Sequence, residues 1–451
     1  MERYLVVGGV AALGTFLLTF PVRALAGRLG VVVQPDARRV HTRPTPTVGG
    51  TAMVLAAVAA MAVAWRSGLF AGEFRGSSEP LGVVLAGVVI YLVGMIDDLR
   101  EVSAPAKVAG MVLAAMILYY SGVTMYFFKV PLTHQVLVLS SAVTPLVTVL
   151  WVVGMANAIN LIDGLDGLAA GTIAIAAGAF CVYGIELEHL GLLSTDSIGP
   201  LVAAIACGVC VGFLPHNFHP ARIFMGDAGA LLLGLLMAAS TSVVGGRTAD
   251  TSGHTYFFFA PLLIPLVILG VPILDMAFAI VRRTARRTGL ATPDKAHLHH
   301  RLLQMGHGHR RSVLLLWAWT AVLSGFVLEP LFDPHANAFI PFAVGGLAIV
   351  LLTIFRPGWR RRPEGRHYAS APGQAPGGAG TASVARVPAP VGAQAVSDGP
   401  ASAATNGTGS PAANGSANGA ASPAANGAAS PAVDGSASPA VDGSATLVER
   451  H

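Results

Sequence analysis

Two adjacent carboxylates, Asp97 and Asp98, end an apolar stretch that reads YLVGMIDDLREVSAPAK. Neighbouring carboxylates repel each other, so the pair needs a cation nearby or a raised pKa. Lys107, at the start of the next apolar stretch, is one candidate partner, and a divalent metal is another. The alternative interpretation is a solvated helix end, so the pair needs support from other polar residues.

A second polar segment reads NAINLIDGLDGLAAG, with Asn157, Asn160, Asp163 and Asp166 at intervals of three residues. This spacing is close to helical and predicts that the four side chains share a face. The glycine after each aspartate allows a tight turn and the close approach of a ligand. Carboxylate and amide oxygens suit Mg²⁺, which shares the phosphates of a substrate. A calcium loop does not fit, because the D-x-D-x-D-G spacing is absent.

A third segment, HNFHPARIFMGDAGALLLG, places Asp227 among small residues where we predict that an apolar helix begins. The amides and dipole of a helix N-terminus favour an anion such as a phosphate. Asn217 and Arg222, upstream of Asp227, add a hydrogen-bond donor and a fixed positive charge. This segment therefore predicts a phosphate-binding helix end.

A fourth segment, PDKAHLHHRLLQMGHGHRRS, contains His297, His299, His300 and Arg301. The histidine spacing resembles that of zinc sites, but cysteine partners and a carboxylate in metallopeptidase register are missing. Two interpretations remain. We favour recognition of phosphate and sugar over a basic patch beside the membrane.

Two other polar positions are ambiguous. The segment PDARRVHTRPTPTVGG has several prolines, and its polar residues serve either function or rigidity: Asp36, Arg38, Arg39 and His41. Asp275 lies within an apolar stretch and is either part of a site or a hydrogen-bonded structural acid.

The elements that position these residues follow from composition. The 451 residues are 53% hydrophobic and 11% charged, whereas a soluble domain has roughly 25% charged residues. Lipid is therefore the expected solvent. The net charge of +5 does not by itself indicate nucleic acid, and no nucleic-acid partner is predicted. The three cysteines lie in apolar runs and are predicted to be structural: Cys181, Cys207 and Cys210.

About 20 apolar residues cross a bilayer as a helix, and helices are required because unpaired backbone groups are costly in hydrocarbon. The sequence predicts an all-α polytopic membrane protein with about eleven spans: 3–25, 48–65, 81–97, 106–121, 136–156, 168–185, 198–214, 229–245, 257–281, 312–328 and 338–355.

Basic residues predict the orientation of these spans. One set of connections, with the segment after the last span, carries 20 lysines and arginines, and the opposite set carries 5. The basic set is expected in the cytoplasm, so the N-terminus is outside and the C-terminus inside. All the polar segments above then lie at the cytoplasmic face. A transporter would more naturally place such groups near the bilayer midplane.

The chain after the last span changes in character. Residues 1–366 are predicted to form the membrane domain, whereas 367–451 is rich in Ala, Gly, Ser, Pro and Asn. Such a segment lacks the apolar surface needed to offset its ordering entropy. We predict a disordered cytoplasmic tail.

Together, the five loop motifs resemble those of the polyprenyl-phosphate N-acetylglucosamine-1-phosphate transferases. These belong to the glycosyltransferase 4 superfamily, which also contains the phospho-N-acetylmuramoyl-pentapeptide transferases. The resemblance runs from about residue 3 to 355, with all five motifs in order. The segment H-L-H-H-R-L-L is similar to the N-acetylglucosamine branch, whereas the peptidoglycan branch has a P-x-H-H-H-F-E type segment.

The resemblance implies roles for individual residues on the acceptor side. Asp97 and Asp98 match the family's aspartate pair beside the lipid phosphate, and Lys107 matches its following lysine. Whether Asp97 acts as a base or only organises cations is open.

On the donor side, the resemblance implies that Asn160, Asp163 and Asp166 line the nucleotide site. Asp227 matches the family's magnesium ligand in M-G-D-x-G, so Mg²⁺ is the implied cofactor, with Mn²⁺ as an alternative. His299 and His300 match a histidine pair of the last loop.

The implied reaction joins UDP-GlcNAc and a polyprenyl phosphate, undecaprenyl or decaprenyl, and releases UMP. The expected location is the inner (plasma) membrane, and a homodimer is left open. A muramoyl-pentapeptide transferase is the nearer alternative, and a membrane transporter is the alternative from a different class.

Overall fold

A computed structural model describes residues 1–33, 44–100, 102–129, 136–245, 307–332 and 339–354, with the single residues 247, 270, 273, 277, 281 and 302. Residues Met1–Pro363 belong to one compact unit. Several predicted features lie outside the described residues: the loop residues 36–41, most of the span 257–281 with Asp275, the segment 294–301 and the tail.

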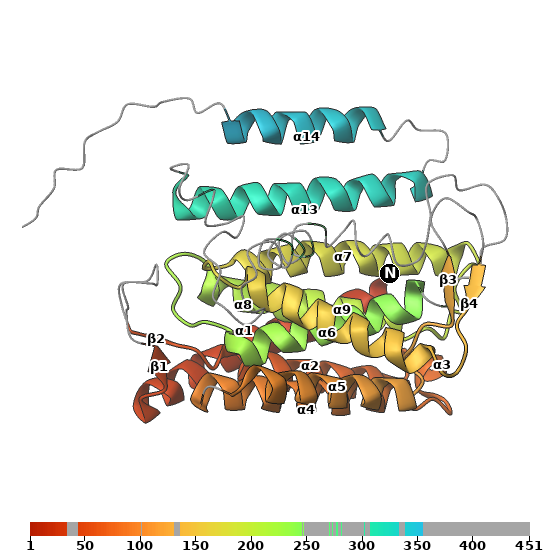
Figure 1. The fold of residues 1–451 in the computed structure, drawn as a ribbon, viewed down its shortest axis with the longest axis horizontal. Helices are drawn as coiled ribbons and strands as arrows, with labels where there is room; N and C mark the ends of the chain where they lie inside the picture. Colours follow the sequence, from red (N-terminus) through yellow and green to blue (C-terminus); the bar gives the residue numbers. More distant parts are fainter. Residues whose placement is uncertain are drawn as a thin grey trace, which may run out of the picture. The chain divides into compact units, whose positions relative to one another are not determined.

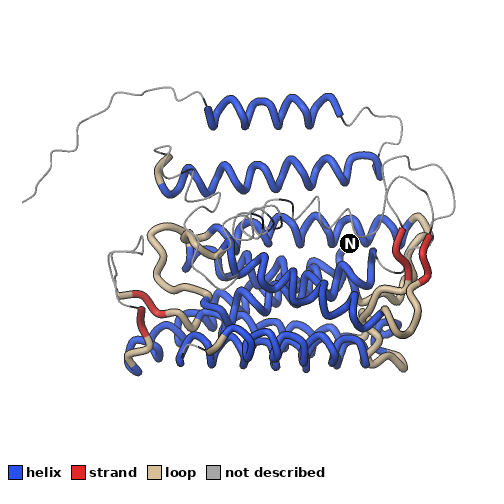
Figure 2. The backbone as a smooth tube through the Cα atoms, viewed as in Figure 1, coloured by secondary structure: helices blue, strands red, loops and turns tan. Residues whose placement is uncertain are grey.

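The described chain is mainly helical (Figures 1 and 2). Its helices are α1 (Glu2–Leu29), α2 (Gly49–Ser67), α3 (Ala71–Phe74), α4 (Glu79–Arg100), α5 (Ala104–Tyr120), α6 (Thr144–Ile162), α7 (Leu168–His189), α8 (Gly199–Asn217), α9 (Gly226–Gly245), α13 (His309–Phe332) and α14 (Phe339–Ile354). Two antiparallel pairs of short strands accompany them: β1 (Val32–Val33) with β2 (Thr45–Pro46), and β3 (Phe127–Lys129) with β4 (Val136–Val138).

Eight described helices are long and apolar enough to cross a bilayer: α1, α2, α4, α6, α7, α8, α9 and α13. The helices α5 and α14 are shorter and also apolar. Every predicted span other than 257–281 thus corresponds to a described helix.

Two predictions about these elements were wrong in detail. The all-α description omitted the strand pairs. The span predicted at 136–156 begins too early, because residues 136–138 pair with β3 and the helix starts at Thr144, just before Pro145. Proline is favoured in the first helical turn, where its missing N–H has no partner to lose.

The helix α9 lies at the centre of the bundle. After Asp227 its sequence is uncharged and apolar on all sides, which is typical of a helix surrounded by protein. Its candidate span is 94% buried, the most of any described span. The helices α2, α4, α6, α7 and α8 pack around it, α1 packs on α2 and α8, and α13 packs on α7. The first turn of α9 is therefore held from several sides.

Glycines allow the helices around α9 to approach its first turn closely. A Cβ atom at Gly94 of α4 would overlap the backbone of Ala228, and one at Gly50 of α2 would overlap the backbone of Gly229. Both contacts lie beside Asp227, so small residues set the position of the acidic helix end.

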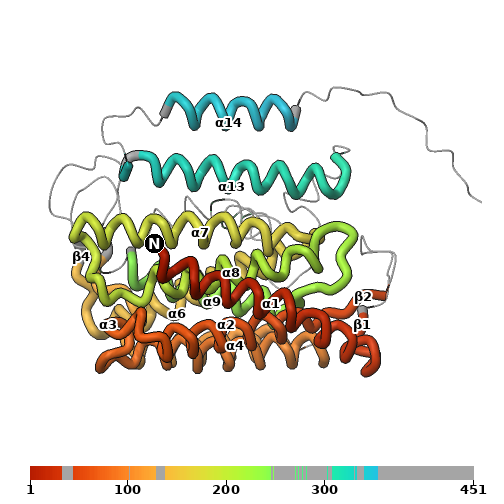
Figure 3. The backbone as a smooth tube through the Cα atoms, turned by 180° about the vertical axis from the view of Figure 1, so that it is seen from behind, coloured from red at the N-terminus to blue at the C-terminus, as the bar shows by residue number. Residues whose placement is uncertain are grey.

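The successive helices from α4 to α9 alternate in direction, so that alternate ends meet at the same end of the bundle (Figures 1 and 3). The strands β1 and β2 lie at one end, on the left of Figure 1, and β3 and β4 lie at the other. The C-terminal ends of α4, α6 and α8 and the N-terminal ends of α5, α7, α9 and α13 meet at the β1–β2 end. Among the described residues, this end carries the polar side chains singled out above: Asp97, Asp98, Lys107, Asn157, Asn160, Asp163, Asp166, Asn217, Arg222 and Asp227.

Candidate active site

Lys107 joins two carboxylates from different helices. Asp97, in the last turn of α4, accepts hydrogen bonds from the Val102 amide at 2.7 Å and from Lys107 Nζ at 2.8 Å. The same ammonium contacts Asp227 Oδ2 in the first turn of α9. Of the two candidate partners of the aspartate pair, Lys107 is in contact with it, through Asp97.

Asp98 binds the first turn of α9. Its carboxylate oxygens accept hydrogen bonds from the Asp227 amide at 2.9 Å and the Ala228 amide at 3.0 Å. The preceding Gly226 has φ 69°, and a Cβ there would overlap this carboxylate and the Thr47 carbonyl oxygen. The helix end was predicted to bind a phosphate through its amides. In the structure Asp98 already occupies two of these amides.

Asn160, in the last turn of α6, lies beside the same charges. When its amide is oriented to suit its neighbours, Nδ2 donates to Asp227 Oδ1 at 3.1 Å and Oδ1 accepts from Lys107 Nζ at 3.2 Å. Asn160 therefore bridges the ammonium and the carboxylate, and its position depends on where α6 ends.

Asp163 follows the end of α6 and lies half-buried beside other acids. Burial raises its pKa from 3.8 to about 7, with further contributions from the charges of Asp98 and Asp166. A cation at this position would offset that effect, because it favours the ionised carboxylate.

The prediction that four polar residues share one face of a helix was wrong. The amide of Asn157 donates to the Val153 carbonyl oxygen of its own helix at 2.7 Å. The helix ends at Ile162, so Asp163 and Asp166 follow a turn rather than the helical repeat. An interval of three also drifts around a helix of 3.6 residues per turn.

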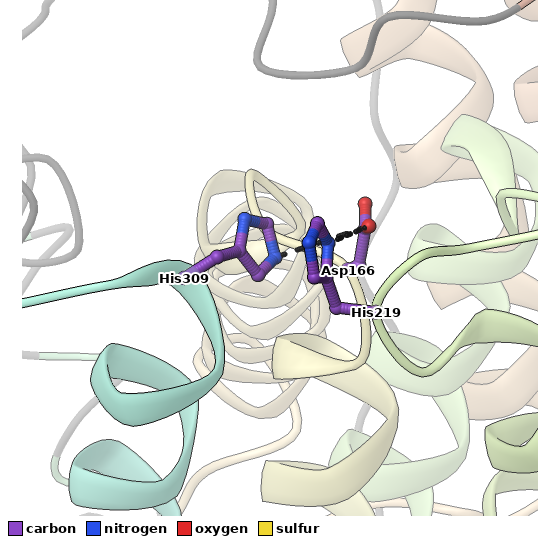
Figure 4. Close-up of side chains that lie close together, drawn as sticks. All are labelled: Asp166, His219 and His309. Atoms are coloured by element: carbon purple, nitrogen blue, oxygen red, sulfur yellow. Dashed lines mark hydrogen bonds and ion pairs between the residues drawn. The ribbon is translucent and has the colours of Figure 1, made fainter.

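Asp166 contacts a different set of residues (Figure 4). Its Oδ2 accepts hydrogen bonds from His219 Nδ1 at 2.6 Å and from the Ala221 amide at 3.1 Å. His309, at the start of α13, stacks on His219 with ring centroids 4.1 Å apart, and its Nε2 lies 4.0 Å from Asp166 Oδ2. Three segments distant in sequence therefore meet at Asp166.

The buried Asn217 links two loops of the site. Its Oδ1 accepts from the Gly167 amide at 2.9 Å, and its Nδ2 donates to the Ile223 carbonyl oxygen at 3.0 Å. Arg222, by contrast, is exposed. His297, His299, His300 and Arg301 lie outside the described residues.

The charge balance around Lys107 differs from that at the far end of the bundle. At the far end arginines match the acids: Arg3 pairs with Glu73 at 2.9 Å and Glu188 at 3.4 Å, and Arg247 pairs with Glu79 at 2.7 Å. At the β1–β2 end, Lys107 is the cation that contacts the acids Asp97 and Asp227, and further acids adjoin them among the described residues: Asp98 and Asp163. This excess of oxygen donors suits a divalent cation and an anionic ligand.

Sequence reasoning did not select His219 and His309 as site residues. His219 lies in the same segment as Asp227, and His309 lies in the segment with the other histidines. Their partners became apparent only from the packing of α13 on α7, where Trp317 Nε1 donates to the Leu168 carbonyl oxygen at 3.4 Å.

Comparisons with known proteins agree with the resemblance drawn from the motifs. The glycosyl transferase family 4 sequence model matches residues 80–245. Decaprenyl-phosphate N-acetylglucosaminephosphotransferase of Mycobacterium tuberculosis is 39% identical over 370 residues, which cover 79% of this chain and 91% of the relative. A probable undecaprenyl-phosphate N-acetylglucosaminyl 1-phosphate transferase of Bacillus subtilis is 36% identical over 329 residues, covering 73% and 84%. A phospho-N-acetylmuramoyl-pentapeptide-transferase of Desulforudis audaxviator is 33% identical over 353 residues, covering 72% and 97%.

Proposed function

Because this membrane protein belongs to glycosyl transferase family 4, we propose that it transfers N-acetylglucosamine-1-phosphate from UDP-N-acetylglucosamine to a polyprenyl phosphate and releases UMP. The observation that carries the proposal is the cluster in which Lys107 contacts both Asp97 and Asp227 at the ends of apolar helices. At the ends of membrane-spanning helices, a lipid phosphate in the bilayer and a nucleotide in water can reach the same side chains.

The reaction is a phosphoryl transfer between two anions. An oxygen of the lipid phosphate attacks the phosphorus that carries the sugar, and the bond from that phosphorus to the bridging oxygen of UMP breaks. Neutralising charge and aligning the reactants are the main demands on such a site. Lys107 supplies a fixed positive charge between the reactants, and Asp97 and Asn160 hold its ammonium in place.

The residues present fit a divalent cation of the Mg²⁺ type. Asp227 and Asp163 supply carboxylate oxygens, which are ligands that Mg²⁺ prefers. The raised pKa of Asp163 is also the result expected for a carboxylate that lacks a cation partner. These two residues would hold the ion, whose charge offsets that of the sugar nucleotide diphosphate.

The remaining residues bind and position the substrates. Asp98 fixes the first turn of α9, and Asn217 joins the loops after α6 and α8. We assign nucleotide binding to Asp166, Asn157 and Arg222. The residues 297, 299, 300 and 301 are proposed to contact the sugar and phosphates.

The proposed topology has eleven spans, with the N-terminus outside and the β1–β2 end of the bundle in the cytoplasm. The positive-inside rule supports this orientation, because the connections that the sequence assigns to the cytoplasmic side carry 20 lysines and arginines, against 5 on the other side. UDP-sugars are cytoplasmic substrates, so this orientation places the site where its donor is available.

The test is UMP release by purified protein with Mg²⁺, a short polyprenyl phosphate and a panel of UDP-sugars. We expect turnover with UDP-N-acetylglucosamine and none with UDP-N-acetylmuramoyl-pentapeptide. The control is Asp227→Asn, which keeps the shape of the side chain and removes its charge. Preference for the pentapeptide donor would make the muramoyl branch the correct one. Nucleotide binding without UMP release would favour a transporter.

A further inference from the structure

We propose that Asp166, His219 and His309 form a second metal site, for a transition ion of the Zn²⁺ class, that fastens α13 to the loops after α6 and α8. The proposal gives Asp166 a metal-binding role in addition to its proposed place in the nucleotide site, because one carboxylate oxygen can bind an ion while the other faces a ligand. It does not depend on which sugar nucleotide the enzyme uses.

The first observation is the convergence of three donor groups from separate segments. One ligand atom from each residue lies within 4.8 Å of the other two. Asp166 follows α6, His219 follows α8 and His309 begins α13, and all three side chains point toward one another (Figure 4). Small rotations about their side-chain bonds would bring the three donors around one ion.

The second observation is the state of His309. Its side chain is 9% exposed, and neither ring nitrogen has a hydrogen-bond partner among the described residues. A buried polar group without a partner is costly, so an unpaired one calls for an explanation such as an ordered water or a bound ion. Coordination through one imidazole nitrogen would remove this cost at the nitrogen nearer Asp166.

The donor set selects the class of ion. Two imidazole nitrogens and one carboxylate oxygen suit Zn²⁺, Co²⁺ and similar ions, whereas Mg²⁺ prefers oxygen donors throughout. The carboxylate and amide oxygens around Asp227 thus differ in chemistry from this trio. His219 is 35% exposed, which leaves a path for the ion from solvent.

Binding exchanges a proton for the ion. His219 Nδ1 now donates its proton to Asp166, so an ion ligated by this nitrogen displaces that proton to solvent. The Ala221 amide and the His219 carbonyl oxygen, which accepts from Arg310 Nε at 3.1 Å, keep the loop in place during the exchange.

The consequence for the fold is a link between α13 and the active-site loops. α13 also packs on α7 through Trp317, near Leu165, which directly precedes Asp166, and Leu168, which begins α7. A metal bound by Asp166 and His309 would fix the start of α13 to this cluster.

The experiment is a Co²⁺ titration of the purified full-length protein in detergent with excess Mg²⁺, followed by visible absorption. We expect one Co²⁺ per chain, displaced by Zn²⁺, and a rise in thermal unfolding midpoint with Zn²⁺. His309→Gln and His219→Gln should each weaken Co²⁺ binding at least about tenfold and abolish the thermal shift. Gel filtration and circular dichroism establish that both variants are folded.

Two control variants separate this site from others. Asp227→Asn and the double variant His299→Gln, His300→Gln should both bind Co²⁺ as the unaltered protein does. Unchanged Co²⁺ affinity in His309→Gln, or its loss in either control, would overturn the proposal. UMP release is measured separately on the same samples. The Co²⁺ titration does not depend on transferase activity, so failure of the proposed function and failure of the metal site can be told apart.

Discussion

Lys107 holds an ammonium between carboxylates from two different helices, α4 and α9. The acid Asp97 also accepts the Val102 amide, so its orientation is fixed by two donors. Lys107 and its partners therefore provide both charge and position at the site. Substitutions of Asp97 and of its neighbour Asp98 should differ in what they affect, turnover or stability, as well as in the size of the effect.

Asp97→Asn should lower the turnover number, because the lysine then loses one of its two anionic partners. If Asp97 is an obligatory base, the loss should be at least about a hundredfold, and it should shrink as rising pH ionises the acceptor. If it organises cations, higher Mg²⁺ should restore part of the activity and pH should not. Rates across pH and Mg²⁺ decide between these roles. Asp98→Asn is the matched comparison and should act through stability, since Asp98 binds the first amides of α9.

Equal and mild effects from the two substitutions would remove the aspartate pair from the catalytic residues. A normal thermal midpoint in Asp98→Asn would contradict this role, because Asn keeps one acceptor oxygen and leaves the second amide N–H unpaired, which typically costs about 1–3 kcal/mol.

Asp163 should give the metal-free protein a pH-dependent stability. Its pKa in the folded protein is about 7, above the ordinary value of 3.8. A raised pKa stabilises the fold at low pH, and this contribution is lost as pH rises through about 7. Without Mg²⁺, the thermal midpoint should fall as pH rises from about 4 to about 7 and level off above that, and it should fall less in Asp163→Asn. Identical pH profiles for the two proteins would show that Asp163 is not the titrating group.

At the scale of elements, close packing of α4 on α9 fixes the distance between Asp97 and Asp227. Gly94→Ala should disturb it, because the added methyl group overlaps the Ala228 backbone, which cannot move aside. Overpacking typically costs about 1–3 kcal/mol, and we expect loss of both stability and turnover. The measurements are thermal midpoint and UMP release.

The control for this substitution is Gly87→Ala, on the same helix. Its methyl group would meet only the end of the Leu232 side chain, at 3.4 Å. This variant should keep normal activity, and its stability should change by less than about 1 kcal/mol. Equal damage from both substitutions would indicate a general effect on α4.

The hydrophobic pattern predicted most of the elements, because the bilayer requires long apolar helices. It located α9 and the acid that opens it, and the structure confirms that Asp227 lies in its first turn. It placed the start of α6 wrongly, because Val136–Val138 are equally compatible with a strand and with the end of a span. The prediction that Asn160 and Asp166 share a helical face was also wrong. Sequence spacing does not show where a helix ends, and α6 ends at Ile162, before Asp166.

At the scale of the whole molecule, the pairing of Lys107 with the aspartates was predictable because the two are near in sequence. The contact of His219 with His309 was not, since it depends on α13 packing against α7 across the intervening segments. Charged residues that are close in sequence can be predicted to interact, whereas two single histidines about 90 residues apart cannot.

The proposed orientation can be tested with two exposed arginines from opposite ends of the bundle, Arg75 and Arg222. In a chain whose native cysteines are replaced, Arg75→Cys should react with an impermeant maleimide on intact cells. Arg222→Cys should react only after the membrane is opened, because the positive-inside rule places it in the cytoplasm. The reverse pattern would invert the topology.

Deletion of residues 370–451 should leave catalysis nearly unchanged. This segment has few large apolar residues and follows α14, the last helix of the described part of the chain. UMP release and membrane insertion should both be measured. A fall in rate of more than about tenfold, in protein that inserts normally, would show that the tail takes part.

The gathering of helix ends at one level means that the two proposed substrates arrive through spaces of different dimension. The sugar nucleotide diffuses through a volume, and its supply is a molar concentration. The polyprenyl phosphate diffuses in a plane, and its supply is a mole fraction among the surrounding lipids. Extra neutral lipid thus dilutes the acceptor while leaving the donor unchanged. When the acceptor is limiting, the rate of the enzyme then depends on the mole fraction of polyprenyl phosphate in the membrane and not on the volume of the cell.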